Sequence, residues 1–215
     1  MTTPDAVTSP GTPVRPELPA MLLTMTGGAG AGKTTLADTL ADTLVDALAV
    51  QREAVTVLHL DDYYHFTDPT RGSWIPDETG TPRLDVGDPR SIDFAGLDSD
   101  AAAALATSTL VIAEGLFAIQ VNPSAPHTRF DVFVDLAADL RLARKIYRKC
   151  VCDGFPIDIL LANYLNHRRG AHDRYTEPAR HRADLIVDAE LPADQLAAQI
   201  WQAASEQTRG RSPAR

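Results

Sequence analysis

The stretch Thr26–Thr35, with the sequence T-G-G-A-G-A-G-K-T-T, decides the fold of this chain. Gly27, Gly32, Lys33 and Thr34 fit the spacing Gly-x-x-x-x-Gly-Lys-[Ser/Thr]. An apolar run suited to a buried strand precedes the stretch, and an amphipathic helical pattern follows it. A flexible Gly/Ala turn could match the spacing by chance, but chance would not supply both flanks. The context therefore predicts a P-loop, whose backbone N–H groups surround a phosphate.

Each residue type in this loop is needed for a different physical reason. Glycines let the backbone turn tightly and point its N–H groups inward, and the N-terminus of the following helix adds a partial positive charge. Lys33 can reach the β and γ phosphates, while the Thr34 hydroxyl can bind Mg²⁺. The loop thus predicts ATP and Mg²⁺ as ligands, and its nucleotide-binding residues are Gly27, Gly28, Ala29, Gly30, Ala31, Gly32, Lys33, Thr34 and Thr35.

Apolar strand patterns and helical patterns alternate along the rest of the chain. Strands are predicted at residues 21–25, 55–60, 109–113, 132–136 and 183–187. Helices are predicted at residues 33–50, 94–106, 139–152, 157–169 and 193–207. This alternation predicts an α/β fold, a parallel sheet of about five strands with helices on both faces, as in P-loop NTPases.

The length of 215 residues and the 44% hydrophobic content suit one well-cored domain, predicted to span residues 20–208. Residues 1–19 are rich in Pro, Thr and Ser and read as a disordered lead-in, while residues 209–215 read as a frayed basic tail. Residues 62–91 contain repeated prolines and glycines. This segment is too long for a plain connection and is therefore expected to be a functional, substrate-binding loop.

Composition and charge argue against several classes of protein. The formal net charge of -9 and the pI near 5.0 disfavour non-specific binding to nucleic acid or to an anionic membrane. Apolar runs fall short of the roughly 20 residues of a membrane span, and the first residues lack the layout of a signal peptide. Cys150 and Cys152 suit neither a disulfide nor a shared metal site, and the histidines lack zinc-binding spacing. We expect a cytoplasmic protein that acts on a small molecule.

Two carboxylates follow predicted strands. Asp61 follows the run V-T-V-L-H-L at residues 55–60, and Glu114 follows the run T-L-V-I-A at residues 109–113. Either carboxylate could simply cap a helix. Beside a P-loop, however, a carboxylate at the end of a strand can hold Mg²⁺ or accept a proton from an attacking hydroxyl. The predicted metal-binding set is therefore Thr34, Asp61 and Glu114.

Several segments together resemble the uridine kinase and phosphoribulokinase family. They are TGGAGAGKTTLA, LHLDDYYHF and LVIAEGLFAI, supported by FDVFVDLAADLRLARKIYRK and EPARHRADLIVD, and they cover the chain from about Met21 to Asp188. Members are P-loop kinases that phosphorylate a hydroxyl of a small metabolite, typically the 5′-hydroxyl of a nucleoside. The resemblance implies an ATP-dependent kinase with a short helical lid at about residues 150–170, and uridine or cytidine as the first acceptors to consider.

The resemblance also implies roles for individual residues. Asp61 matches the family's general base or orienting carboxylate, and Glu114 matches the carboxylate near the metal and phosphates. Lys145 and Arg148 match basic residues that lean over the phosphates, which makes Asp61, Lys33 and Arg148 the predicted catalytic residues. Tyr64 and Asn163 match residues near the nucleoside base. The predicted substrate-binding residues are Asp61, Tyr64, Asp85, Asp88, Asn163 and Arg168.

Two segments depart from the family pattern. The lid pattern Glu-Arg-Gly-Arg-Asp corresponds here to Cys152–Pro156, in which Asp153 and Phe155 replace both arginines. Arg168 or Arg169 could compensate for this loss. The aspartate expected to hold the ribose hydroxyls falls on Gly87, so Asp85 or Asp88 could serve instead. A changed acceptor is the simplest single account of both departures.

Other functions stay open at this point. The acceptor could be nicotinamide riboside, another ribosyl compound or a small alcohol. The chain could also be a P-loop regulator without efficient transfer, although it lacks the Asn-Lys-x-Asp segment of a GTPase. The aromatic residues Tyr63, Tyr64, Phe66 and Trp74 could line a substrate site or form a small core under the loop. The choice between ATP and GTP, and homo-oligomer formation, are also left open by the sequence.

Overall fold

The computed structural model describes residues 20–48, 54–77 and 79–210. The predicted lead-in, residues 1–19, lies outside the described residues, as do residues 211–215 of the predicted tail. Arg209 and Gly210 still belong to the last helix, α6 (Ala193–Gly210), so this helix extends into the segment predicted as a tail. None of the helices in the described residues is long and apolar enough to cross a membrane.

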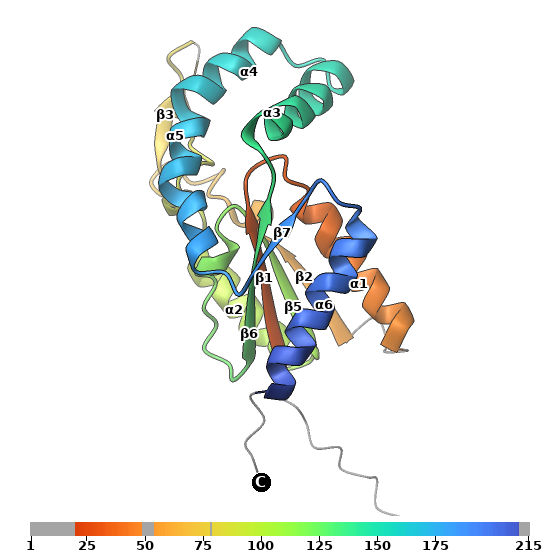
Figure 1. Ribbon diagram of the computed structural model, residues 1–215. Helices are drawn as coiled ribbons and strands as arrows, with labels where there is room; N and C mark the ends of the chain where they lie inside the picture. Colours follow the sequence, from red (N-terminus) through yellow and green to blue (C-terminus); the bar gives the residue numbers. More distant parts are fainter. Residues whose placement is uncertain (1–19, 49–53, 78, 211–215) are drawn as a thin grey trace, which may run out of the picture.

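A five-stranded parallel sheet forms the centre of the molecule (Figure 1). Its order is β2-β5-β1-β6-β7. The strands are β1 (Met21–Gly27), β2 (Val55–His59), β5 (Leu110–Gly115), β6 (Thr128–Asp135) and β7 (Leu185–Asp188). The predicted fold class and all five predicted strands are confirmed, with boundaries that shift by one to four residues.

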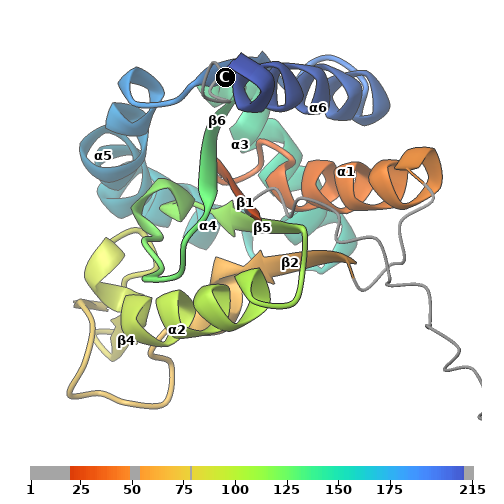
Figure 2. The ribbon, with the colours of Figure 1, turned by 90° about the horizontal axis from the view of Figure 1, so that it is seen from below.

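Helices cover both faces of this sheet, as Figure 2 shows from below. On one face, α1 (Lys33–Leu48) and α6 pack on alternate strand residues such as Leu23 and Met25. On the other face, α2 (Phe94–Leu105) packs on the residues between them, such as Leu22. Because side chains alternate between the faces of a strand, a strand that is covered on both faces must be apolar throughout. This requirement explains the uninterrupted apolar runs in the sequence.

The loop at residues 62–91 is more ordered than the sequence predicts. It contains a two-stranded antiparallel sheet of β3 (Trp74–Pro76) and β4 (Pro82–Leu84). The Asp77 side chain closes the connecting turn by accepting hydrogen bonds from the backbone N–H groups of Thr79 and Thr81 at 2.9 and 2.8 Å. Strands of three residues are too short to give a readable pattern of alternation, which is why the sequence predicts only a loop here.

Two helical arms rise above the carboxyl ends of the strands (Figure 1). The first arm is α3 (Ala138–Ile146) continued by a π-helical turn, Tyr147–Cys152. Gly154, with a φ of 70°, turns the chain into the second arm. The second arm begins with α4 (Ile157–Asn163) and continues through α5 (Arg169–Ala171) to Thr176, beyond the predicted end at residue 169. Gly170 has a low helix propensity, but the helix continues through it. The arm ends before Pro178, which lacks the N–H group that a continuing α-helix needs.

Candidate active site

The loop between β1 and α1 lies directly beneath α3 (Figure 1). Gly30 and Gly32 have φ angles of 87° and 92°, a left-handed conformation that favours glycine. A Cβ atom on Gly27 would lie 2.4 Å from the Val134 carbonyl oxygen, and one on Gly28 would lie 2.3 Å from Arg141 Nη1. Glycine is therefore needed both where the loop turns and where Val134 and Arg141 approach its backbone.

Lys33 is buried at the first turn of α1, and its Nζ atom donates a hydrogen bond to the Gly28 carbonyl at 3.2 Å. Burial lowers the pKa of the Lys33 ammonium, and the nearby Glu114 and Asp61 carboxylates oppose this shift. The guanidinium groups of Arg141 and Arg148 lower the pKa of Lys33 further. A buried cation of this kind is stabilised by an anion in the loop.

Thr34 and the two predicted carboxylates come together at the ends of β2 and β5. The Thr34 hydroxyl donates a hydrogen bond of 2.9 Å to Glu114 Oε1, and Glu114 is buried. Asp61 lies in the short 3-10 helix that follows β2. Partial removal from water in the cleft raises the pKa of the Asp61 carboxyl; the charge of Glu114 raises it further, while Lys33 lowers it. Hydroxyl and carboxylate oxygens are the ligands that Mg²⁺ prefers.

His59 joins this group although the sequence assigned it no role. Its Nδ1 atom lies 2.9 Å from Glu114 Oε1, and this hydrogen bond raises the pKa of His59. In the sheet, His59 at the end of β2 pairs in register with Glu114, the residue before the last one of β5. The signal that could have identified His59 is therefore its place at the end of a strand, which is informative only once the strand order is known.

The first lid arm places cations above the P-loop. Three basic residues of this arm lie on one helical face because they are spaced four and three residues apart. They are Arg141, Lys145 and Arg148. Arg141 contacts the loop directly: its guanidinium lies against Gly28, and its Nε atom donates to the Leu136 carbonyl at 3.0 Å. The sequence predicted Lys145 and Arg148 but missed Arg141. The same helical spacing could have identified Arg141.

The loop that ends at Ser91 meets the second lid arm. Arg168 forms an ion pair with Asp85, whose Oδ1 atom also accepts the Gly87 N–H at 3.0 Å. A Cβ atom on Gly87 would lie 2.9 Å from the Ala171 Cβ atom, so the loop and the arm touch at this point. The Tyr64 hydroxyl donates to the Val86 carbonyl at 2.8 Å, which ties the loop to the segment after Asp61.

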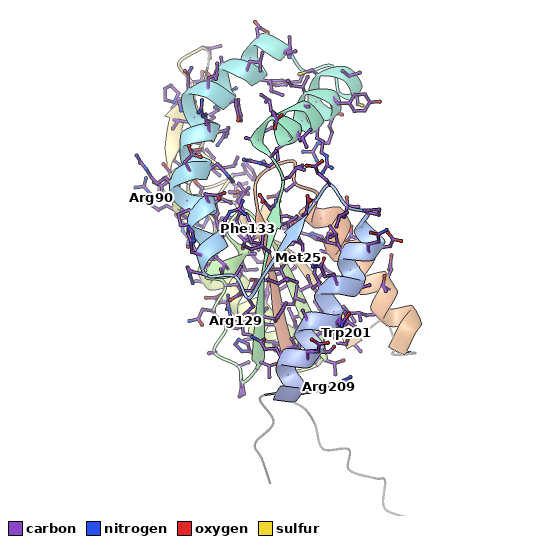
Figure 3. The ribbon with its side chains drawn as sticks, viewed as in Figure 1. Met25, Arg90, Arg129, Phe133, Trp201 and Arg209 are labelled. Carbon is purple, nitrogen blue, oxygen red and sulfur yellow. The ribbon has the colours of Figure 1, made fainter. Side chains whose placement is uncertain are left out.

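Asp88, which the sequence places in the substrate set, is held by hydrogen bonds within its own loop. It is buried, its Oδ1 atom accepts the Arg90 N–H at 2.9 Å, and its Oδ2 atom lies 2.7 Å from Arg90 Nη2. Arg90 points outward from the side of the molecule (Figure 3). The Asp88 carboxylate thus caps the turn Pro89–Ser91 and pairs with a surface arginine. Asp88 follows Asp85 by three residues, and nothing in the sequence shows that its side chain turns toward Arg90.

The aromatic residues of the loop divide between core and surface. Tyr63 and Tyr64 pack against the core beneath α2, and the Tyr63 hydroxyl donates to Asp100 at 2.7 Å. Phe66 is exposed, with its ring centroid 5.5 Å from that of Tyr64, and the Trp74 indole donates to the Arg71 carbonyl. The interpretation as a satellite core fits Tyr63, whereas Tyr64 lies on the side of Asp85 and Arg168.

Two adjoining cavities are lined largely by residues of the lid arms. The P-loop cavity, of about 230 Å³, is lined by residues that include Ala29, Gly87 and Arg141. The lid cavity, of about 290 Å³, is lined by residues that include Val86 and Asn163. Both share Lys145, Tyr164 and Arg168. The predicted residues Lys145, Asn163 and Arg168 thus all line the lid cavity, and Lys145 and Arg168 also line the P-loop cavity.

A third cavity, of about 220 Å³, lies on the outer side of the P-loop. Its lining includes Ala31, Gly32 and Thr35 of the loop, together with Leu191 from the segment between β7 and α6. Arg144 borders this cavity and donates a hydrogen bond of 3.1 Å to the Ala189 carbonyl. The P-loop therefore has a hollow on each side.

Comparisons with known proteins show what this chain is similar to in sequence. A sequence model of the Phosphoribulokinase / Uridine kinase family matches residues 90–196. A uridine kinase of Chlamydia pneumoniae is 28% identical over 188 residues, which cover 78% of this chain and 81% of the relative. A uridine kinase of Halobacterium salinarum is 25% identical over 191 residues, which cover 79% of this chain and 80% of the relative.

Solved structures of kinases share the fold. The APS kinase of Mycobacterium tuberculosis, solved in complex with AMPPNP and APS, superimposes with a TM-score of 0.54 at 16% identity, over 86% of this chain and 98% of that one. A gluconokinase from Sinorhizobium meliloti gives a TM-score of 0.53 at 14% identity, over 89% of this chain and 95% of that one. The family match and the named relatives agree, so the chain is similar in sequence to the phosphoribulokinase and uridine kinase family, and its sheet and P-loop have the fold of P-loop kinases.

Proposed function

We propose that this chain transfers the γ-phosphate of ATP to a hydroxyl of a nucleoside-like metabolite, as a uridine kinase does. The observation that carries this proposal is the convergence of Lys33, the Thr34–Glu114 pair and Asp61 beneath the cations of the first lid arm. Phosphoryl transfer requires positioning and neutralisation of spreading negative charge more than covalent help. This site offers a cradle, carboxylates and cations in one place.

The residues present fit both a nucleotide and a divalent cation. The bare glycine backbone and the buried Lys33 suit phosphate oxygens, and the paired oxygens of Thr34 and Glu114, with Asp61 nearby, suit Mg²⁺. When bound, the metal ion would neutralise charge on the β and γ phosphates. The hollow beside Ala31 and Arg144 is the place for the donor base, since it opens from the same loop.

The chain's own groups would share the work of transfer. Asp61 would orient the acceptor hydroxyl and accept its proton, and its raised pKa brings the carboxyl closer to the range of a general base. Lys33 and Arg148 would neutralise the charge that develops on the transferred group, and Arg141 would hold the loop. Closure of the lid arms would exclude water, which otherwise competes with the acceptor hydroxyl.

The acceptor would occupy the space between Asp61 and the second lid arm. Tyr64, Asp85 and Arg168 surround the loop side of this space, and Asn163 lies on the arm side. Arg168 is thus at a position to compensate for the arginines that the turn Cys152–Pro156 lacks. The names of the relatives make a pyrimidine nucleoside the first acceptor to test, followed by nicotinamide riboside.

The test is acceptor-dependent formation of ADP from Mg-ATP. The purified chain is assayed with uridine, cytidine, other ribonucleosides, nicotinamide riboside and pantothenate, and without acceptor. We expect one acceptor to raise the rate well above the control, and we expect Lys33→Ala to abolish that increase. ADP formation that ignores every acceptor would instead favour a nucleotide-binding regulator, and full activity of Lys33→Ala would contradict the P-loop site.

A further inference from the structure

His59 and Glu114 lie side by side on the face of the sheet that α1 covers. They are register partners on the parallel strands β2 and β5. Two residues earlier on each strand, Val57 and Ile112 belong to the core on which α1 packs. Because side chains two residues apart on a strand point to the same face, His59 and Glu114 lie on the α1 side, where Thr34 begins the helix with Lys33. The sheet itself therefore brings the imidazole to Glu114.

The hydrogen bond between these two residues has a defined direction. The Nδ1 atom of His59 lies 2.9 Å from Oε1 of Glu114. An ionised carboxylate, the form that binds a metal ion, can only accept hydrogen bonds, so Nδ1 carries the proton and has no lone pair for a metal ion. The charges of Asp38 and Asp62 also act on His59, but in the described part of the chain Glu114 is the acidic residue that its imidazole bonds. His59 is thus a donor to Glu114.

Glu114 uses one of its two oxygens for these contacts. Its Oε1 atom accepts hydrogen bonds from His59 Nδ1 and from the Thr34 hydroxyl, each at 2.9 Å. Among the described residues, no backbone or side-chain group donates to Oε2. The Oε2 atom and the lone pairs of the Thr34 oxygen are therefore left for a divalent cation, and they are of the oxygen type that Mg²⁺ prefers.

Glu114 depends on protein donors for its orientation because little water reaches it. Its side chain is 5% exposed, whereas the His59 side chain, on the edge strand β2, is 34% exposed. A glutamate side chain has several rotatable bonds, and fixing it costs conformational entropy. A donor that fixes the carboxylate before the metal ion arrives removes this cost from the binding step. The bond from His59 therefore prepares Glu114 for a cation more firmly than the Thr34 bond does alone.

We propose that His59 is a positioning residue for the divalent cation. Its Nδ1–H group holds the Glu114 carboxylate in one orientation and so strengthens the binding of the cation that accompanies the nucleotide. Loss of a hydrogen-bonded partner of a metal ligand weakens metal binding about 10–100-fold in known metal sites. The inference rests on the proposed kinase site and adds to it a residue that acts through Glu114 and takes no part in the transfer step itself.

Two substitutions with different reach test this donor. Asparagine places its side-chain N–H group as many bonds from the backbone as Nδ1 of histidine, whereas glutamine places it one bond farther, like Nε2. His59→Asn therefore keeps the donor to Glu114, and His59→Gln loses it. His127→Gln is the matched control, because His127 also uses Nδ1, in a contact of 2.7 Å with the Ala125 carbonyl. His127 precedes β6 and so lies at the opposite end of the sheet.

The measurement is the affinity of the full chain for the β,γ-imido analogue of ATP, which does not transfer its γ-phosphate. Calorimetry determines this affinity with excess Mg²⁺ and again in EDTA. We expect His59→Gln to weaken binding about tenfold or more with Mg²⁺, while its affinity in EDTA stays at the parent value. His59→Asn and His127→Gln should keep the parent affinity under both conditions. Thermal unfolding curves show that each variant is folded.

The outcomes separate this inference from the kinase proposal. Unchanged affinity of His59→Gln with Mg²⁺ would overturn the inference, and so would equal losses in His59→Asn and His59→Gln. An equal loss with Mg²⁺ and in EDTA would also contradict it, because the effect would then not concern the cation. The kinase proposal survives these results, since acceptor-dependent ADP formation tests it independently. If Mg²⁺ fails to tighten binding of the analogue by the parent chain, the inference and the predicted metal set fall together.

Discussion

The Glu114 side chain connects separate parts of the candidate site. Its Oε1 atom accepts the Thr34 hydroxyl hydrogen bond and lies 2.9 Å from His59 Nδ1, and its charge raises the pKa of Asp61. One buried carboxylate therefore joins the end of β5 to the P-loop helix and to the end of β2. Substitutions of its partners should affect activity more than they affect stability.

Thr34→Val tests the hydroxyl of the P-loop helix. Valine keeps the shape of threonine but removes the donor to Glu114 and the predicted metal ligand. We expect kcat/KM to fall about 100-fold, about 2.7 kcal/mol, and the Mg²⁺ concentration needed for half-maximal rate to rise. Thr39→Val is the control, because the Thr39 hydroxyl donates to the Thr35 carbonyl of the same helix. Equal activity of both variants would remove Thr34 from the metal set.

Asp61→Asn tests the carboxylate that would orient the acceptor. The amide cannot accept a proton, so kcat should fall by about 10²–10⁴-fold, while the affinity for ATP, measured by calorimetry, should change less than about twofold. Asp62→Asn, the exposed neighbour, should stay near the parent rate. Near-normal turnover of Asp61→Asn would show that another group receives the proton.

The sequence identified residues whose position depends on local pattern alone. Lys33 and Thr34 follow from the loop spacing, and Asp61 and Glu114 follow from strand ends. His59 was missed because its contact with Glu114 depends on β5 lying beside β2, which no local pattern states. Asp88 was expected to bind the substrate, and the sequence gives no sign of the hydrogen bonds that hold its carboxylate to Arg90. Contacts between distant segments were thus the unpredictable part of the site.

The strands of the central sheet and the long helices could be predicted from the sequence. The hairpin β3–β4 was not predicted, and the second lid arm ends later than predicted. Buried parallel strands and amphipathic helices impose periodic patterns on the sequence. The hairpin β3–β4 is held by the Asp77 turn and is too short for a period. The second arm passes through Gly170 because tertiary packing overrides a weak local preference.

A pair of glycine substitutions tests the contact between the loop and the second arm. Gly170→Ala should raise the free energy of unfolding by about 0.5–1 kcal/mol, since a Cβ atom there meets nothing within 4 Å. Gly87→Ala should lower it by about 1–3 kcal/mol, because its Cβ atom would lie 2.9 Å from that of Ala171. Gly87→Ala should also raise the acceptor KM. Denaturant titration measures both effects, and equal shifts would show that the two elements do not touch.

The base of the second arm is anchored by Arg180, which bonds Asp135 at the end of β6 and Glu177. Hydrogen bonds from Arg180 hold the pKa of Asp135 below its ordinary value. A carboxyl with a lowered folded-state pKa stabilises the fold above its unfolded pKa, about 3.9, and this stabilisation is lost as the pH falls through the folded value.

Asp135→Asn should therefore lower the unfolding temperature at pH 7, and the difference from the parent should shrink below about pH 4. Thermal scans from pH 7 to pH 3 measure this difference. Asp38→Asn, an exposed residue of α1, provides the matched control and should follow the parent at each pH. A difference that persists unchanged to pH 3 would mean that the Asp135 charge does not stabilise the anchor.

In the whole molecule, the distribution of charge matters more than its sum. The chain has a formal net charge of -9, yet the lid arms and P-loop gather Lys33, Arg141, Lys145, Arg148 and Arg168 around one cleft. A basic cleft in an acidic molecule concentrates small anions while it repels polyanions from the remaining surface. This arrangement suits an enzyme that binds a nucleotide between a rigid sheet and two helical arms.

The central claim is that this cleft transfers a phosphoryl group to an acceptor hydroxyl. The most direct measurement is the fate of the label from [γ-³²P]ATP, followed with Mg²⁺ and the acceptor that gives the highest rate of ADP formation. We expect the parent chain to transfer the label to the acceptor and the Lys33→Ala variant to transfer none. Label that appears only as inorganic phosphate, or equal transfer by the Lys33→Ala variant, would contradict it.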